Sequence, residues 1–171
     1  MADSQPIVRK KIGCQQVLLQ DSSVFSIQWM VLPHSYHGNI SPLFLMERYL
    51  HYIRAFTLSL IRPLRTGDGV EFRLLHTGIS LISFTGPSMG PDSVKLSISG
   101  GVLVQPDSCQ RGELSFIARP INKGLKVILQ LSDFCPLLLG SKPSRIRKIF
   151  YRITQAYIHK IVTVRFLART Y

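Results

Sequence analysis

Alternating apolar and polar positions dominate the middle of the chain. Between residues 70 and 131 hydrophobic side chains recur at every second position, which is typical of strands that bury one face. Turn-forming residues interrupt this alternation at 76–78, 86–91, 106–108 and 122–124, and glycines 100 and 101 predict a bulge or bend. We therefore expect strands over 70–74, 79–85, 94–104, 114–118 and 125–131, joined as an antiparallel meander.

Two β-prone runs near the N-terminus, residues 17–19 and 24–31, flank the turn-forming residues 21–23 and predict a hairpin. In the second run Phe25, Ile27, Trp29 and Val31 alternate with other residues, so we expect Trp29, the only tryptophan, to anchor the core. Residues 1–12 are expected to form a mobile or edge segment.

Helical spacing replaces the alternation in two places. Ser41 and Pro42 predict a helix start, and the apolar spacing continues to Ile61 or Arg62, where Pro63 is expected to end the helix. The second helix is expected over residues 143–168, a span of roughly 39 Å. Its predicted apolar stripe consists of Ile146, Ile149, Phe150, Ile153, Tyr157, Ile161, Val164, Ala168 and Tyr171.

A helix of that length cannot be hidden inside one small domain, so its apolar stripe should lie along the sheet while its other side faces water. The expected order is strands, a helix, a strand meander and a long terminal helix, within a single α+β domain over residues 1–171. This order resembles the helix-grip arrangement of the START-like ligand-binding superfamily. The resemblance implies a curved antiparallel sheet packed on the C-terminal helix, with a ligand pocket between them.

Charge changes the picture of the terminal helix. The chain carries 21 Lys and Arg against nine Asp and Glu, a formal net charge of +12, and its last acidic residue is Asp133. The helix is therefore basic, with Arg145, Lys148 and Arg152 on the side expected to face water. These residues are candidate anion contacts for nucleic acid or an anionic membrane surface. A solvated helix face without further function explains the same charges.

The motifs for catalysis or metal binding lack the structural context they need. Residues 86–90 match G-x-S-x-G, but a strand pattern follows instead of the helix that a nucleophile elbow requires. His34 and His37 have no neighbouring cysteine or carboxylate to complete a metal site. We expect no cofactor and no metal, and we place a small cyclase or hydrolase using His76 or Ser88 third among the alternatives.

The cysteines and the charged residues give expectations about the cellular compartment and about membrane insertion. Cys14, Cys109 and Cys135 are an odd number without CxxC spacing, which predicts reduced thiols and a cytoplasmic protein. The N-terminus lacks the apolar segment of a signal peptide. Residues 43–61 are the most apolar helical stretch, but Glu47, Arg48 and Arg54 make a transmembrane span unfavourable.

Hydrophobic residues make up 46% of the chain and charged residues only 18%, and apolar runs at 102–104 and 127–129 give the sheet two partly apolar faces. One face can pack on the helix while the other lines a pocket. The sequence thus favours a non-catalytic protein that binds an apolar or amphipathic small molecule, such as a lipid, between sheet and helix. The candidate pocket residues are Trp29, Phe72, Phe84, Phe116 and Leu129.

Overall fold

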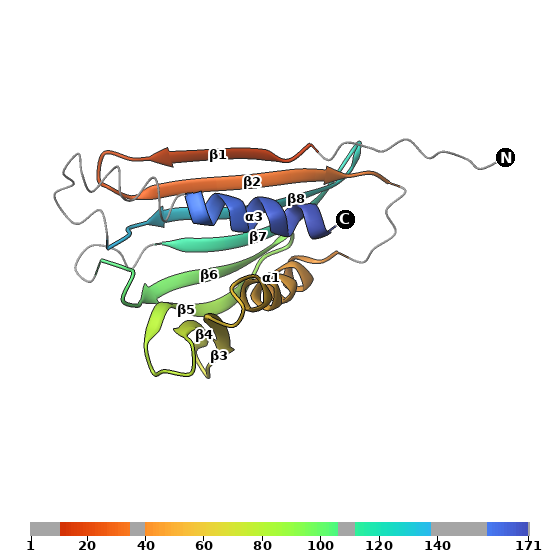
Figure 1. Cartoon of the computed structure of the whole chain (residues 1–171). Coiled ribbons are helices and arrows are strands. Elements are labelled where there is room, and N and C mark those ends of the chain that lie inside the picture. The colour runs from red at the N-terminus through yellow and green to blue at the C-terminus, as the bar shows by residue number, and fades with distance from the viewer. Residues whose placement is uncertain (1–10, 35–39, 106–111, 138–156, 171) are drawn as a thin grey trace.

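The computed structural model describes residues 11–34, 40–105, 112–137 and 157–170, and these form one antiparallel sheet with two helices on the same face (Figure 1). The strands are β1 (Gly13–Leu18), β2 (Val24–Leu32), β3 (Ile61–Arg65), β4 (Gly69–Leu74), β5 (Ser80–Met89), β6 (Ser93–Gly100), β7 (Glu113–Ile121) and β8 (Gly124–Phe134). The helices are α1 (Pro42–Phe56) and α3 (Tyr157–Thr170). The expected α+β class is confirmed.

The eight strands lie in the order β1-β2-β8-β7-β6-β5-β4-β3, and every neighbouring pair is antiparallel. The predicted meander is confirmed as β4 to β8, each strand paired with the next along the chain. The predicted N-terminal hairpin is β1–β2, and β2 also pairs with β8. The sheet is therefore open, with β1 and β3 as its edges.

Helix α1 begins as expected, because the Ser41 Oγ accepts a hydrogen bond from the Phe44 N–H at 3.1 Å. The expected end at residue 61 or 62 is wrong. The helix ends at Phe56, and Leu58 and Ser59 adopt left-handed backbone angles with φ of 51° and 64°. Residues 61–65 form strand β3 instead. Pro63 is accepted there because β3 is an edge strand with only one pairing partner.

Two strand boundaries in the meander also differ from expectation. The predicted loop at residues 86–91 is wrong, since β5 runs to Met89 across a register shift between Thr85 and Ser88. Residues 102–103 do not continue strand β6. They form a turn, because Gly100 and Gly101 have φ of 158° and 118° and redirect the chain.

Hydrophobic side chains of the sheet's inner face pack against both helices and form the core. Tyr49 of α1 links the two layers, with its ring 5.4 Å from Phe116 of β7 and 5.2 Å from Phe166 of α3. Burial, with a smaller contribution from Tyr52, raises the pKa of Tyr49 well above its ordinary value. The sheet and helices therefore share one apolar layer, in which Phe116 is fully buried.

The C-terminal helix is described from residue 157, and residues 143–156 of the long predicted helix lie outside the described residues. Within α3 the predicted stripe is displaced by about one position. Val162, Thr163, Phe166 and Leu167 are buried, whereas Ile161, Val164 and Ala168 are only half-buried. The reason is tertiary: the Phe166 ring packs against Tyr49 and Tyr52 of α1, so α3 faces a neighbouring helix as well as β2.

Strand β2 buries the opposite face from the one that the sequence predicts. Ser26, Gln28 and Met30 face the inner side and are buried, whereas Trp29 is half-buried on the face that points away from the helices. Gly13 lies directly against the indole ring, and the Lys126 Nζ sits 5.8 Å from the ring centre. Trp29 is therefore not the core anchor that we expected.

Cys135 is disulfide-bonded, and its partner lies outside the described residues. Cys14 is a free thiol. The expectation that all three cysteines are reduced is therefore wrong. Local spacing did not reveal this bond because the segment near Cys135 is held by a distant segment, through the Gln105 N–H to the Cys135 carbonyl at 3.1 Å and a bridge between Val104 and Pro136.

Candidate ligand-binding site between α1 and β3

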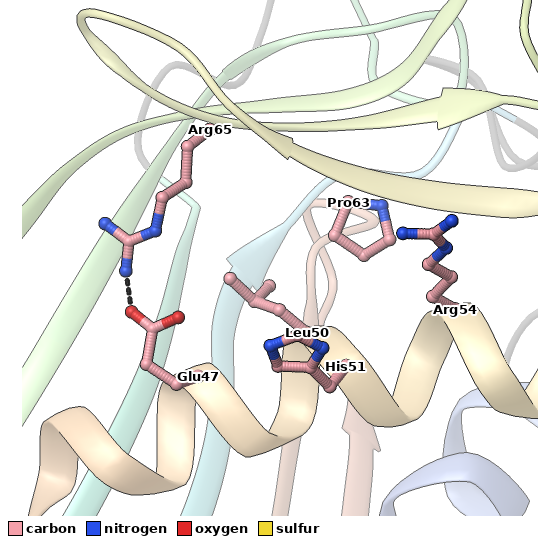
Figure 2. Close-up of a pocket in the computed structure, with 6 residues that line it drawn as sticks. All are labelled: Glu47, Leu50, His51, Arg54, Pro63 and Arg65. Carbon is pink, nitrogen blue, oxygen red and sulfur yellow. Dashed lines mark ion pairs between the residues drawn. The ribbon is translucent and has the colours of Figure 1, made fainter.

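An open cleft of about 190 Å³ lies between one face of α1 and strand β3 (Figure 2). Helix α1 contributes side chains at positions that recur every three or four residues and therefore share a face. Strand β3 closes the opposite side. The lining residues are Glu47, Leu50, His51, Arg54, Pro63 and Arg65.

The cleft is held by local contacts after the end of α1. The Thr57 Oγ1 donates to the Ile53 carbonyl at 2.8 Å and accepts from the Ile61 N–H at 3.1 Å. These bonds reverse the chain within four residues, so β3 returns alongside the helix that precedes it. The site therefore arises within one continuous stretch of sequence.

The cleft carries a positive charge that is not balanced by its own acid. Glu47 is ion-paired with Arg65 across the cleft, as the dashed line in Figure 2 marks. Arg54 has no ion pair with any described residue, and neither has His51. In Figure 2 the Arg54 guanidinium lies beside Pro63, with His51 on the helix between Glu47 and Arg54. Leu50 is buried and Pro63 is half-buried, so both add apolar surface next to the charge.

A second cavity, of about 300 Å³, lies on the outer face over β6, β7 and β8. Its charged residues neutralise one another. The Lys95 Nζ is 3.2 Å from a Glu113 carboxylate oxygen, and the Arg119 Nε is 3.2 Å from an Asp92 oxygen. Because these groups already satisfy each other, this cavity offers a ligand less than the cleft between α1 and β3.

A buried polar cluster lies on the inner side of β1 and β2. The Gln28 Nε2 donates to the Ser26 Oγ at 2.7 Å, and the Gln16 Nε2 donates to the same hydroxyl at 3.0 Å. The Gln28 side chain is completely buried, yet its Oε1 accepts no hydrogen bond from any described residue. A buried unpaired acceptor is rare, because it keeps the cost of leaving water without compensation.

The structure separates the residues that were predicted to line a pocket. Phe72, Phe84, Phe116 and Leu129 are buried on the inner face, where the Phe72 and Phe84 rings lie 5.3 Å apart. Neither cavity described above is lined by them or by Trp29, which faces the other side. The candidate anion contacts Arg145, Lys148 and Arg152 lie outside the described residues.

The residues considered for catalysis and metal binding do not converge either. Ser88 is near the end of β5, whereas His76 is in the turn before that strand begins, so the length of β5 separates them. The His34 Nε2 lies 2.9 Å from the Asn122 carbonyl oxygen, and His37 is outside the described residues. Among the residues that are described, no three His, Cys, Asp or Glu side chains are grouped to hold a metal ion.

The sequence contained a partial signal for the cleft that we did not use. Glu47, His51 and Arg54 mark the polar side of α1, but we expected that side to face water only. The missing information was the position of β3. The predicted helix includes residues 61 and 62, so the sequence pattern does not place Arg65 of β3 beside the polar side of α1.

Comparison with known proteins does not assign a family. No family model matches the chain, and no curated protein matches it. Among solved structures, the crystal structure of CalU16 from Micromonospora echinospora is similar, at 12% identity over 90% of this chain and 98% of that chain, with a TM-score of 0.34. A likeness at this level carries no argument about function. Within the described part of the chain, no helix is both long and apolar enough to cross a membrane.

Proposed function

We propose that this protein is a non-catalytic binder of a small amphipathic anion in the cleft between α1 and β3. The observation that carries the proposal is the pairing of charge and apolar surface in one cavity. Arg54 and His51 lack a carboxylate partner there, while Leu50 and Pro63 offer apolar contacts beside them. A ligand with an anionic head and a short apolar tail meets both requirements.

The chemistry of the lining residues favours binding over catalysis. An arginine guanidinium presents a planar set of donors that matches a carboxylate or phosphate. Glu47, the one carboxylate of the cleft, is held by Arg65 and is a poor candidate for a general base. A volume of about 190 Å³ lies below the usual range for drug-sized ligands, so the ligand should be short.

Isothermal titration calorimetry with n-hexyl phosphate tests the proposal, with hexanol and inorganic phosphate as probes that each lack one half of the ligand. We expect hexyl phosphate to bind more tightly than either. The Arg54→Gln variant should weaken its binding by about tenfold or more, because hydrogen bonds to charged groups contribute about 1.5–3 kcal/mol. Arg119→Gln, which removes an exposed arginine of the outer face, is the matched control.

Equal affinity for hexanol and hexyl phosphate would contradict the anionic part of the proposal. Equal losses in Arg54→Gln and Arg119→Gln would contradict the location, since they would show only a general effect of charge. His51→Gln should cause a smaller loss than Arg54→Gln, because an imidazole offers fewer hydrogen-bond donors than a guanidinium.

The wider helix-grip arrangement, with an apolar ligand between sheet and helices, stays a proposal. It is supported by two helices on one face of an antiparallel sheet and by the aromatic side chains buried there. Binding through the basic C-terminal residues Arg145, Lys148 and Arg152 also stays a prediction. A flat dependence of nucleic-acid binding on salt would reject that alternative.

A further inference from the structure

Seven of the twelve large hydrophobic side chains that are exposed in the described part of the chain lie at one end of the sheet: Leu19 lies after β1, and the other six form a group. They lie in the turns next to β3, β4, β5 and β6 and directly after β8. Leu58 is 91% exposed, and the others are between 45% and 51% exposed. We call them the apolar row: Leu58, Leu60, Leu75, Ile79, Val102 and Leu137.

Backbone hydrogen bonds make this row continuous. Hydrogen bonds join each of the turn segments that carry the row to a neighbouring segment, so the side chains of the row project from adjacent segments. The bonds run from the Leu75 N–H to the Leu60 carbonyl (2.8 Å), Leu74 to Ile79 (2.9 Å), Val102 to Ser80 (3.0 Å) and Leu137 to Leu103 (2.9 Å).

Two leucines of the row occupy backbone conformations that leucine rarely adopts. The φ angles of Leu58 and Leu75 are 51° and 50°, in the left-handed region where Gly, Asn and Asp are the usual residues. Neither side chain is buried, so core packing does not explain the choice of leucine. An apolar side chain held out at the tip of a turn indicates a contact outside the folded chain.

Cations without acidic partners accompany the apolar row. Arg54 is in the last turn of α1, and its carbonyl accepts the Ser59 N–H at 2.8 Å, next to Leu58. Arg62 follows Ile61 at the start of β3, and Lys160 is exposed in the first turn of α3, whose N-terminal end points towards the same side as the ends of β6 and β8 (Figure 1). The Arg165 guanidinium lies 5.8 Å from the centre of the Phe56 ring, at the end of α1. None of these four forms an ion pair with a described residue.

Most acids at or near the same end are already engaged, and the exception is Asp133 near the end of β8, which forms no ion pair with a described residue. The Glu71 carboxylate accepts from the Arg73 Nε at 2.7 Å, and the Asp21 carboxylate accepts from the Ser23 hydroxyl at 2.6 Å. Because these acids do not pair with Arg54, Arg62, Lys160 or Arg165, the apolar row is flanked by cations whose charge is not locally neutralised.

We propose that this end of the sheet docks on the surface of an anionic lipid bilayer. The leucines of the apolar row enter the interface between headgroups and acyl chains, and the four cations contact lipid phosphates and carboxylates. Anionic bilayers attract basic residues near their surface, and interfacial proteins combine such charge with partly inserted apolar side chains. This inference goes beyond the small-molecule site and does not rest on it.

Charge and shape favour the bilayer over the two other occupants. A second copy of the chain docked through the same row would bring the two sets of cations towards each other, which like charges oppose. Nucleic acid would meet the cations, but aliphatic side chains at turn tips do not provide the aromatic surfaces on which bases stack. Only a bilayer offers anionic and apolar layers together.

Vesicle co-sedimentation of the full chain tests the proposal, using phosphatidylcholine vesicles with and without phosphatidylserine. We expect binding that requires phosphatidylserine and weakens with salt. Leu58→Asp should reduce the partition coefficient about tenfold or more. Aspartate suits the left-handed angle and the position is exposed, so the fold should be retained. Met89→Asp, at a 62% exposed position at the other end of β5, is the matched control.

The cation contribution is tested by the double variant Lys160→Gln, Arg165→Gln, neither of which lines the cleft. Each cation near an anionic surface contributes about fivefold to affinity, so the pair should lose about thirtyfold. Hexyl phosphate binding by Arg54 and His51 should be unchanged in this variant and in Leu58→Asp. That readout distinguishes failure of bilayer docking from failure of the small-molecule site.

Three results would overturn the proposal. Binding to phosphatidylserine vesicles that is equal in the wild-type protein and Leu58→Asp would remove the role of the apolar row. Light scattering that shows a dimer, dissociated by Leu58→Asp, would assign the row to self-association. Tight binding to a nucleic-acid duplex without binding to vesicles would assign the cations to nucleic acid instead.

Discussion

The unpaired Oε1 of Gln28 leads to the most direct prediction about stability. Gln28→Met replaces the amide with an apolar, unbranched side chain of similar length. The buried acceptor that lacks a donor disappears, and with it a cost of about 2 kcal/mol within the usual range of 1–3. We therefore expect this substitution of a fully buried polar residue to stabilise the protein.

The substitution also removes the two hydrogen bonds that the Gln28 amide donates, and these set the size of the net effect. The longer one runs to the Cys14 Sγ at 3.6 Å and contributes little, because sulfur is a weak acceptor. The Gln28 Nε2 donates to the Ser26 Oγ at 2.7 Å, and losing such a bond costs about 1 kcal/mol. Ser26 keeps its bond from the Gln16 Nε2 at 3.0 Å, so its hydroxyl is not left unpaired. The net gain is then about 1 kcal/mol, equivalent to an increase in Tm of about 2–4 °C for a chain of this size.

Urea unfolding followed by the fluorescence of Trp29, the only tryptophan, measures the change in the free energy of unfolding. Gln105→Met is the matched control. That glutamine is also buried, but its Nε2 donates to the Pro136 carbonyl at 3.0 Å, and it has no buried side-chain atom that lacks a partner. We expect the control to destabilise the protein by about 1 kcal/mol.

Destabilisation of Gln28→Met by as much as the Gln105 control would refute the reasoning. It would mean that the Gln28 Oε1 has a donor within the folded protein, and that the buried cluster on β1 and β2 is an ordinary satisfied network. A rise in stability for Gln28→Met and a fall for Gln105→Met is the outcome that the geometry predicts.

Two further substitutions test the packing of sheet and helices. Gly124→Ala should lower the free energy of unfolding by more than about 1 kcal/mol, since Gly124 has a φ of 130° and an added Cβ would collide with the Leu32 carbonyl. Gly78→Ala, where the added Cβ meets open space, should change the free energy of unfolding in urea by less than about 0.5 kcal/mol. Phe116→Ala should cost about 3–5 kcal/mol by calorimetry, because its fully buried ring packs on Tyr49; a cost below about 1 kcal/mol would contradict its place in the core.

The alternation of apolar residues predicted the strands of the meander correctly because it is a local property. In β4, β6, β7 and β8 apolar residues recur at every second position, and turn residues such as Asn122 lie between the strands. Strand β5 loses this alternation after Thr85, which is why its C-terminal part was predicted to be a loop. The start of α1 was also predicted from a local feature, since Ser41 caps the helix through a hydrogen bond with a residue three positions later. These features do not depend on what packs against them.

Features that depend on distant neighbours were decided by the tertiary structure. Alternation alone could not say which face of β2 is buried, and pairing with β8 under α3 buried Gln28 instead of Trp29. The end of α1 was hidden because residues 58–62 have helical spacing, whereas their pairing with β4 makes them a turn and a strand.

The same distinction between local features and tertiary contacts applies to the candidate sites. The sequence by itself determined the excess of positive charge and the polar side of α1, because residue types and helical spacing are local facts. Only the tertiary structure brought Pro63 and Arg65 across from Arg54, and aligned Leu58, Leu75 and Val102 at one end of the sheet. The chain reversal after Phe56 and the register of each strand pair set these placements, and residue periodicity alone encodes neither of them.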